Sequence, residues 1–161
     1  MKTVLKAGAL AAGVALFLAA GTAGAADRHA GYYYPEPQTK ETYTARSRTL
    51  AEANRAMRIG YVTGTTLQHL NRPYPPQIAI FAKGAEAEKL IVVGLVDGRV
   101  DTLFRARAIF ANMTAAARQL PAFAQMGVQD SFTFFDLAKM LGFQQITITD
   151  GRDFAHRVFI E

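Results

Sequence analysis

The sequence contains no cysteine and no tryptophan. Without cysteine the chain has no disulfide, no thiolate nucleophile and no thiolate ligand for a metal ion. Its stability must therefore come from packing, for which its 11 phenylalanines are well suited. Serine is also scarce: the serines are Ser47 and Ser131, and each stands where a helix cap is expected. We therefore do not expect a serine nucleophile.

Recognisable catalytic motifs are missing as well. The chain has no glycine-rich phosphate loop ending in Lys-Ser or Lys-Thr, no G-x-S-x-G elbow and no H-E-x-x-H pair. Gly60 and Gly64 belong to a segment with the pattern of a strand, so they do not indicate a nucleotide-binding fingerprint. These absences favour a protein without a catalytic site or cofactor.

Positive charge is in mild excess. The formal net charge of the chain is +5, and two of its basic residues, Lys2 and Lys6, belong to an N-terminal segment that we expect to be removed. Proteins that bind nucleic acid usually carry a larger and more clustered excess of positive charge. We therefore expect no nucleic-acid partner.

The N-terminus holds an uncharged apolar run, but a short one. This run covers residues 7–20, follows a positively charged start and leads into the small residues of 21–26. A membrane span needs about 20 predominantly apolar residues, whereas a short run before a small-x-small pair such as Ala23-x-Ala25 is typical of a secretory signal peptide. We expect residues 1–25 to be removed, with cleavage after Ala25 or Ala26. The mature protein is then periplasmic or secreted, with no transmembrane span.

The expected mature chain opens with an extended arm over residues 26–45. The prolines that follow its three adjacent tyrosines favour extended backbone. Neighbouring side chains of an extended chain point to opposite sides, so some tyrosines should pack on the domain while others face water or a partner. The residues that we predict to bind a protein partner in the cell envelope are Tyr32, Tyr33, Tyr34, Arg105 and Arg107.

Residues 46–161 have the pattern of a single domain. Thr49 and Glu52 form a capping box, which predicts a helix over 49–59 with Arg58 on its solvated outer face. Runs rich in β-branched and apolar residues then predict strands. These strands are expected over 61–70, 77–83 and 90–96.

The second half of the domain is expected to begin with a helix. An apolar stripe predicts this helix from Asp101 or Thr102 to about residue 119. Asp130 or Ser131 is expected to cap a further helix that ends near Leu141. A hairpin then joins strands over 145–149 and 154–160. The elements together predict an α+β domain with a mainly antiparallel sheet of about five strands, packed against three or four helices.

Histidine is the residue type in this sequence that is best suited to catalysis or metal binding. His156 alternates with the apolar Phe154 and Val158, so we expect a hydrogen-bonded histidine on a buried face. His69 ends the predicted 61–70 strand, and two histidines without a third ligand indicate a metal site only weakly. A hydrolase that uses His156 with Asp150 or Asp153 is the alternative interpretation.

Whether a third histidine, His29, can bind a metal depends on where the signal peptide is cleaved. If cleavage follows Ala26, the mature chain begins Asp27-Arg28-His29. A free amine, two backbone amides and an imidazole at position three then form a square-planar set suited to Cu(II) or Ni(II). If cleavage follows Ala25, this metal site is lost.

Several segments resemble a known family. These segments are Asp27–Pro35, Phe81–Gly84, Lys89–Leu95, Leu103–Ala108, Phe134–Leu137, Leu141–Phe143, Asp150–Gly151 and Phe154–His156. Together they are similar to a family of small exported bacterial proteins that often carry the label "molybdopterin-guanine dinucleotide biosynthesis protein A", over nearly the whole chain after residue 26. The label implies guanylyl transfer from GTP to molybdopterin.

The resemblance assigns no catalytic residue. Guanylyltransferases of that kind open with a glycine-rich Leu-x-Gly-Gly loop, and no such loop occurs after residue 26. We therefore expect a soluble periplasmic accessory or binding protein, with the enzyme of the family label as the alternative.

Overall fold

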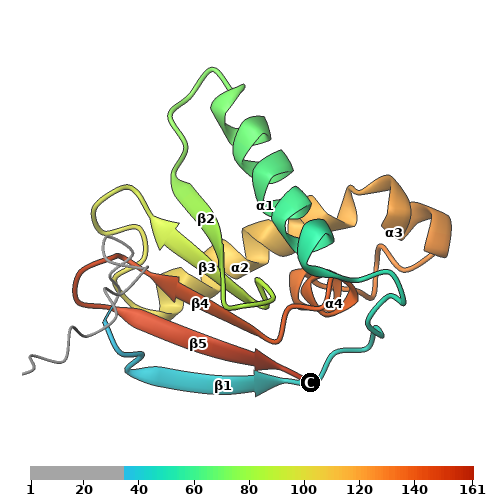
Figure 1. The fold of residues 1–161 in the computed structure, drawn as a ribbon. Coiled ribbons are helices and arrows are strands. Elements are labelled where there is room, and N and C mark those ends of the chain that lie inside the picture. Colours follow the sequence, from blue (N-terminus) through green and yellow to red (C-terminus); the bar gives the residue numbers. More distant parts are fainter. Residues whose placement is uncertain (1–34) are drawn as a thin grey trace, which may run out of the picture. The chain divides into compact units, whose positions relative to one another are not determined.

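The computed structural model describes residues 35–161. The predicted signal peptide, the metal site of Asp27, Arg28 and His29, and Tyr32, Tyr33 and Tyr34 lie outside the described residues. In chain order, the elements are β1 (Thr39–Tyr43), α1 (Arg55–Leu70), β2 (Ile78–Lys83), β3 (Lys89–Gly94), α2 (Leu103–Arg118), α3 (Pro121–Met126), α4 (Phe134–Met140), β4 (Gln145–Thr149) and β5 (Ala155–Ile160), as drawn in Figure 1.

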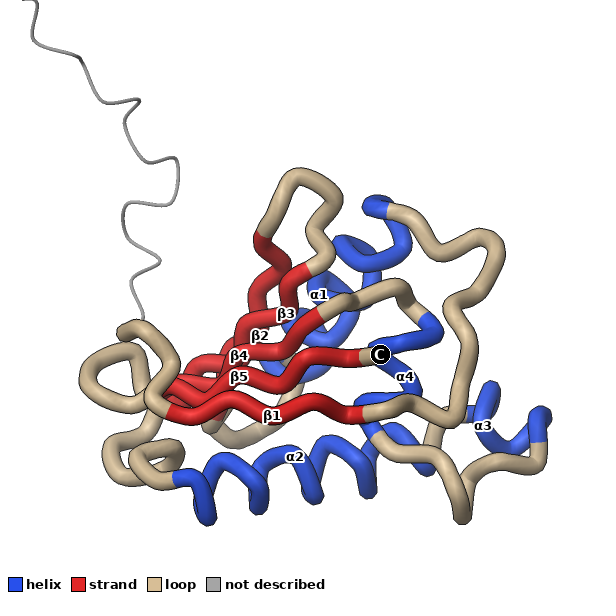
Figure 2. Tube along the Cα trace, turned by 90° about the horizontal axis from the view of Figure 1, so that it is seen from below, coloured by secondary structure: helices blue, strands red, loops and turns tan. Residues whose placement is uncertain are grey.

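The strands form one sheet in the order β1-β5-β4-β3-β2. The prediction of an α+β domain with about five strands is confirmed, but the sheet is mixed rather than mainly antiparallel. β2 with β3 and β4 with β5 are antiparallel hairpins, whereas β3 with β4 and β1 with β5 are parallel. The physical reason is the long connection through α2, α3 and α4, which returns the chain to the same end of the sheet before β4 begins. Seen along the sheet, α2 lies below the strands (Figure 2).

β1 is the strand that the sequence did not predict. It lies inside the segment expected to be an extended arm, and it pairs with β5 at the edge of the sheet. The extended conformation was therefore correct for Thr39–Tyr43, but this part of the arm belongs to the domain. A strand that carries Lys40 and Glu41 shows no continuous apolar signal because one of its edges and part of one face are open to solvent.

The predicted strand over 61–70 is wrong, because α1 covers this segment. Asn54 caps the helix, its side chain accepting a hydrogen bond from the backbone N–H of Met57, and the predicted capping box over 49–52 lies in a loop. The run contains β-branched residues and two glycines, which disfavour helix intrinsically. Packing of Tyr61 and Val62 against the core outweighs this preference.

The boundaries of the later helices also differ from the prediction. α4 begins at Phe134 with Thr133 as its cap, in place of Asp130 or Ser131. The short helix α3 starts at Pro121, where the sequence predicted only the end of the preceding helix. Proline suits the first helical turn because the missing N–H has no partner there. β2, β3, α2 and the hairpin of β4 and β5 confirm the remaining expected elements within a few residues.

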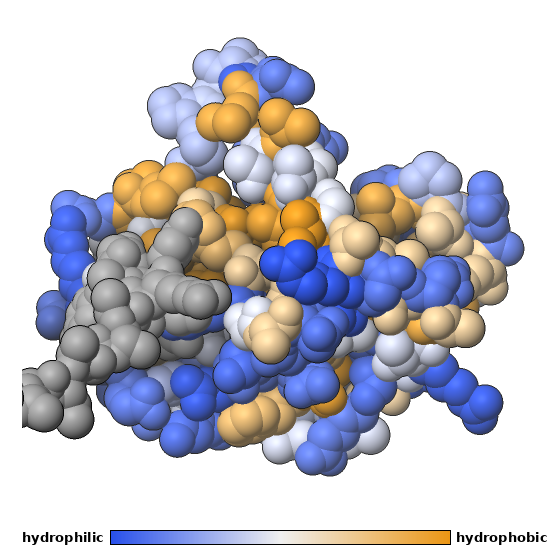
Figure 3. All heavy atoms as spheres, viewed as in Figure 1, coloured by the Kyte–Doolittle hydropathy of each residue, from blue (hydrophilic) through white to orange (hydrophobic). Residues whose placement is uncertain are grey.

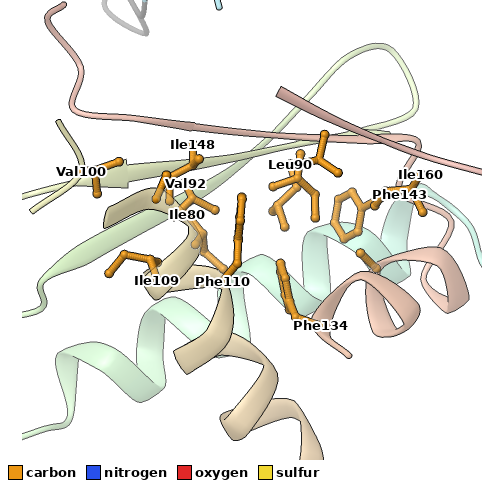
Figure 4. Packing of buried hydrophobic residues seen from close by; sticks show 14 residues of the cluster. Ile80, Leu90, Val92, Val100, Ile109, Phe110, Phe134, Phe143, Ile148 and Ile160 are labelled. Atoms are coloured by element: carbon orange, nitrogen blue, oxygen red, sulfur yellow. The ribbon is translucent and has the colours of Figure 1, made fainter. Parts of the chain in front are cut away.

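The core lies between α2, α4, α1 and one face of the sheet. Figure 4 shows Phe110 and Phe134 directed from α2 and α4 toward Leu90 and Val92 of β3. These four side chains are at most 3% exposed. Burial of one such side chain contributes about 1.5–3 kcal/mol relative to exposure. None of the helices in the described part of the chain is long and apolar enough to cross a membrane.

Gly142 follows the last turn of α4 and lies close to Arg58 of α1. Its φ is 81°, and a Cβ atom placed there would lie 2.6 Å from Nη1 of Arg58 on α1. Gly127, which ends α3, has a similar φ of 67°, but no heavy atom lies within 4 Å of its Cβ position. Alanine substitutions at Gly142 and Gly127 therefore distinguish the cost of a positive φ from the cost of a steric clash with Arg58.

We expect Gly142→Ala to lower the free energy of unfolding by about 2 kcal/mol and Gly127→Ala by about 1 kcal/mol. The difference arises because only alanine at 142 displaces the Arg58 guanidinium. Urea denaturation followed by circular dichroism measures both values. Equal losses would show that Arg58 moves aside without cost.

Candidate functional site

Two adjoining hollows lie between α1 and α2. One has a volume of about 350 Å³ and is closed at one side by the 71–77 loop, and the other has about 370 Å³ and extends to α4. They share the lining residues His69, Arg72, Ile78, Met113 and Ala116. We call the two hollows together the interhelix groove. Its volume falls in the usual range for sites that bind small molecules.

The floor of the interhelix groove is apolar. The apolar side chains that line it include Ile109 and Met113 of α2, Ile78 of β2 and Tyr61 of α1. Burial raises the pKa of Tyr61 to about 12, so this phenol stays neutral at any physiological pH. Such a floor binds the apolar part of a ligand through the hydrophobic effect.

The rim of the groove is polar and cationic. Arg72 and Arg99 line it, and no acidic side chain is among the described residues that do so. His69 lies between the two hollows and makes a hydrogen bond with the backbone of Ile78. Burial, followed by the positive charge of Arg72, lowers the pKa of His69, so its imidazole is mainly neutral at pH 7. The groove thus combines an apolar floor with a positively charged rim.

A second polar cluster joins β1 to β5. His156 is 1% exposed, and its Nδ1 lies 2.8 Å from Oγ1 of Thr39. Its Nε2 lies 3.1 Å from Oε1 of Glu41, whose other oxygen accepts a hydrogen bond from Arg107 at 2.8 Å. Burial alone raises the pKa of Glu41, but the hydrogen bonds and charges of Arg107 and His156 outweigh it and the net pKa is lowered.

The cluster confirms that His156 is a buried, hydrogen-bonded histidine and corrects its expected partners. Asp150 and Asp153 do not contact the imidazole; Oδ1 of Asp150 accepts three backbone N–H groups of its own turn. Thr39 and Glu41 take their place because parallel pairing sets Thr39 beside His156. In sequence these residues are separated by more than 100 positions, so no local pattern indicates them.

The structure separates His69 from this cluster. His69 stands on α1 and lines the interhelix groove, whereas His156 stands on β5. No group of three metal-ligating His, Cys, Asp or Glu side chains occurs among residues 35–161.

The arginines predicted to bind a partner are engaged within the chain. Arg105 forms an ion pair of 2.7 Å with Asp101 and donates to the carbonyl of Gly98. Arg107 pairs with Glu41 and lines a further hollow of about 490 Å³ between β1 and α2, which we call the β1–α2 groove. Both arginine side chains are more than half exposed, so they remain accessible to a partner.

Arg58, predicted on a solvated face, is instead buried at 7% exposure. Its Nε donates to the carbonyl of Glu86 at 2.8 Å, and Nη1 lies 3.3 Å from the carbonyl of Leu141 and 3.4 Å from that of Gly142. The residue faces inward because it lies on the same side of α1 as Tyr61 and Val62, three and four positions later, which pack against the core.

Comparison with family models, with curated proteins and with solved structures found no match.

Proposed function

We propose that this chain is an exported binding protein without a catalytic site, and that its interhelix groove binds a small amphipathic anion. The observation that carries the proposal is the groove itself: an apolar floor of Ile78, Ile109 and Met113 beside the cations Arg72 and Arg99, with no acid among the described lining residues. Export is supported by the features of residues 1–26 in the sequence.

The lining indicates the chemical class of the ligand. An apolar body is needed because hydrocarbon on the floor leaves water without losing hydrogen bonds. An anionic end is needed because a carboxylate or phosphate pairs with guanidinium groups through charge-assisted hydrogen bonds. A medium-chain carboxylate has both parts.

Isothermal titration calorimetry with decanoate tests this proposal, with decanol as the neutral control and acetate as the control without an apolar body. We expect decanoate to bind at least tenfold more tightly than either control. Arg72→Gln should weaken decanoate binding by about tenfold, which corresponds to the loss of one charge-assisted contact. Equal binding of decanol and decanoate would contradict the assignment of an anion.

Two neighbouring alanines of α2 provide a matched pair of variants that locate the ligand. Ala116 lines the interhelix groove, whereas Ala115 lines the β1–α2 groove. Both residues are exposed, so tryptophan fits at either position without disturbing the core. We expect Ala116→Trp to abolish decanoate binding and Ala115→Trp to leave it unchanged. The reverse result would place the ligand in the β1–α2 groove.

The pH dependence of binding gives an independent prediction. In the free protein the pKa of His69 lies below its ordinary value of 6.5. A bound carboxylate beside His69 stabilises the imidazolium and raises this pKa, so binding takes up protons and the affinity for decanoate increases as the pH falls from 7.5 to 5.5. Arg72 and Arg99 are the other charged groups of the rim.

A shift of one pKa unit corresponds to at most a tenfold change in affinity. His69→Gln should remove the pH dependence and retain binding at pH 7.5. Calorimetry at three pH values measures both effects, and an unchanged pH dependence in His69→Gln would show that another group takes up the proton.

A hydrolytic activity is the second candidate function, and the Thr39–His156–Glu41 chain of hydrogen bonds favours it. A hydroxyl, an imidazole and a carboxylate follow one another at 2.8 and 3.1 Å, the order needed for a nucleophile, its base and the group that orients the base. The test is hydrolysis of p-nitrophenyl acetate by the wild type and by Thr39→Val. A rate that is the same in both proteins excludes Thr39 as the nucleophile.

The protein partner predicted in the cell envelope is a separate part of the proposal. Arg105 and Arg107 lie two positions apart on α2 and point to different flanks of the helix, Arg105 toward Asp101 and Arg107 toward Glu41 of β1. Their ion pairs leave more than half of each side chain open to solvent. Exposed ion pairs contribute little stability, so exchange for an acidic partner costs little. A pull-down from envelope extract with wild type and Arg105→Gln/Arg107→Gln tests it: a partner captured equally by both proteins would rule these arginines out.

A further inference from the structure

The end of α1 and the loop after it project from the rest of the domain (Figure 1). We call residues 67–76 the α1 tip. Three large apolar side chains of the α1 tip are mostly exposed: Leu67 at 55%, Leu70 at 64% and Tyr74 at 75%. A single apolar side chain on a surface is ordinary, but several on one projecting end indicate a surface that binds something else.

Helix geometry puts two of these side chains on one side of the α1 tip. Leu67 and Leu70 are three positions apart in the last turn of α1, so they are neighbours on its surface. The helix ends where the backbone N–H of Asn71 donates to the carbonyl of Leu67 at 3.0 Å, and Tyr74 follows in the loop. Figure 3 shows apolar side chains next to hydrophilic ones at this end of the molecule. The α1 tip is therefore amphipathic.

Proline stiffens the loop of the α1 tip. Pro73, Pro75 and Pro76 surround Tyr74 in the sequence, and each fixes its own φ. A segment that is already restricted loses little conformational entropy when it binds. The loop can therefore present Tyr74 to a surface at a small entropic cost.

The charges of the α1 tip are positive. No aspartate or glutamate occurs between Glu52 and Glu86 in the sequence. Arg72 lies in the tip, and Arg99 lines the same hollow as Arg72 and Tyr74. Both arginines are exposed. The α1 tip thus combines exposed apolar side chains with cations, and it has no acid of its own to neutralise them.

We infer that the α1 tip docks on the surface of an anionic lipid bilayer. Leu67, Leu70 and Tyr74 enter the headgroup region, where tyrosine is favoured because its ring is apolar and its hydroxyl reaches water. Arg72 binds lipid phosphate through charge-assisted hydrogen bonds. The inference goes beyond the proposed function and stands on different residues, since Leu67 and Leu70 are not among the described residues that line the interhelix groove.

The size and charge of the α1 tip favour a bilayer over a protein surface. Large side chains bury at most about 150–250 Å² each, so three of them supply less than the roughly 800 Å² that each partner of a stable protein–protein interface buries. Contact between the tips of two copies of the chain would also bring two copies of Arg72 together, with no acid of the tip between them. A bilayer needs no matching shape and presents many anionic groups to the two arginines.

The absence of tryptophan from the chain allows a local test. Leu70→Trp, made in the full chain, puts a single tryptophan on the α1 tip, and Phe104→Trp puts one on α2, where Phe104 is 82% exposed. Vesicles of phosphatidylglycerol and phosphatidylcholine in equal amounts should shift the emission of Leu70→Trp to shorter wavelength. Bromine in the acyl chains should quench this emission. The emission of Phe104→Trp should change in neither case.

Two comparisons separate the contributions of charge and apolar surface. The half-maximal shift of Leu70→Trp should require at least tenfold more lipid when the vesicles contain phosphatidylcholine alone, because the arginines then meet no anionic surface. Adding Leu67→Ser should raise the concentration of anionic lipid needed at least fivefold and leave decanoate binding in calorimetry unchanged. This variant therefore distinguishes a failure of the inference from a failure of the proposed function.

Circular dichroism checks that each variant is folded. An emission of Leu70→Trp that anionic vesicles do not change, or that changes equally in Phe104→Trp, would overturn the inference. Equal shifts with both kinds of vesicle would overturn the role of the arginines. A short-wavelength emission without lipid that is lost on dilution of the protein would show instead that a second copy of the chain covers the tip.

Discussion

Replacing Asp136 by alanine is expected to lower the free energy of unfolding by about 3–4 kcal/mol, more than the loss expected for Gly142→Ala or Arg58→Met. Asp136 is 0% exposed and lies in the first turn of α4. Its carboxylate is the common acceptor of groups from three parts of the chain. These donors are the backbone N–H groups of Arg46 (2.7 Å), Thr133 (2.8 Å) and Ser47 (3.3 Å), and the hydroxyls of Thr133 (2.9 Å) and Tyr43 (3.0 Å).

The size of the effect follows from what alanine leaves behind. Hydrogen bonds to a charged group are each worth more than those between neutral groups, and donors that lose a buried acceptor pay the full cost of desolvation. The contact also joins Tyr43, at the end of β1, to α4, so its loss releases the edge strand. Asp136→Asn keeps the shape but presents an NH₂ group to N–H donors, and we expect it to be only slightly less harmful.

Asp130→Ala is the matched control, because Asp130 is exposed and, among residues 35–161, hydrogen-bonds through its backbone carbonyl, to Arg118. We expect this control to stay within about 0.5 kcal/mol of the wild type. Urea denaturation measures both variants. A loss of less than about 1 kcal/mol for Asp136→Ala would show that water replaces the carboxylate.

The pH dependence of the free energy of unfolding provides a second measure of how the Asp136 carboxylate stabilises the fold. Burial alone raises the pKa of Asp136, but the hydrogen bonds from Thr133, Arg46 and Tyr43 outweigh it and the net pKa is lowered. The folded-state pKa lies below the unfolded value of 3.8, so the ionised carboxylate stabilises the fold above that value and the stabilisation is lost as the pH falls through the folded-state pKa. Glu41, whose pKa is also lowered, acts in the same direction, so Glu41→Gln is the necessary comparison.

Replacing Arg58 by methionine is expected to cost about 2–3 kcal/mol. Methionine retains the apolar stem but removes the donors that the carbonyls of Glu86, Leu141 and Gly142 use. These carbonyls belong to the β2–β3 turn and the end of α4, so the guanidinium holds α1 against both. Lysine should recover only part of the loss, because a single ammonium group does not reproduce the planar guanidinium.

Arg55→Met is the control for this prediction, since Arg55 stands almost one turn earlier on α1 and is exposed. We expect it to change stability by no more than about 0.5 kcal/mol. Urea denaturation gives the global effect, and hydrogen exchange of the α1 amides shows whether the helix is released locally. Equal stability of Arg58→Met and Arg55→Met would mean that Arg58 does not anchor the helix.

Much of the fold was predictable where local signals and burial agree. β3 was expected from its apolar run, in which Ile91 and Val92 are both buried although neighbouring side chains of a strand point to opposite faces. α2 was expected from its apolar stripe, and Thr102 caps it as the sequence indicated. The turn after β4 was expected from Asp150-Gly151, where Gly151 has a φ of 77°.

The wrong predictions have a common physical origin. The segment 61–70 contains residues that favour strands intrinsically, but it is helical because Tyr61 and Val62 then reach the core. Arg58 resembles a surface residue in sequence, and only its three carbonyl partners make its burial favourable. Propensity is worth a few tenths of a kcal/mol per residue, which is less than one buried contact contributes.

The absence of cysteine and of recognisable catalytic motifs was a property of the sequence alone, and it led to the prediction of a binding protein that depends on packing. The α+β class and the buried position of His156 were also determined by the sequence, because periodicity reports which side of an element is apolar. Only the tertiary structure decided the rest. Contacts between distant residues brought Thr39 and Glu41 to His156 and placed Arg72 and Met113 in one groove, and no local pattern encodes such pairings because they depend on the order in which strands and helices pack.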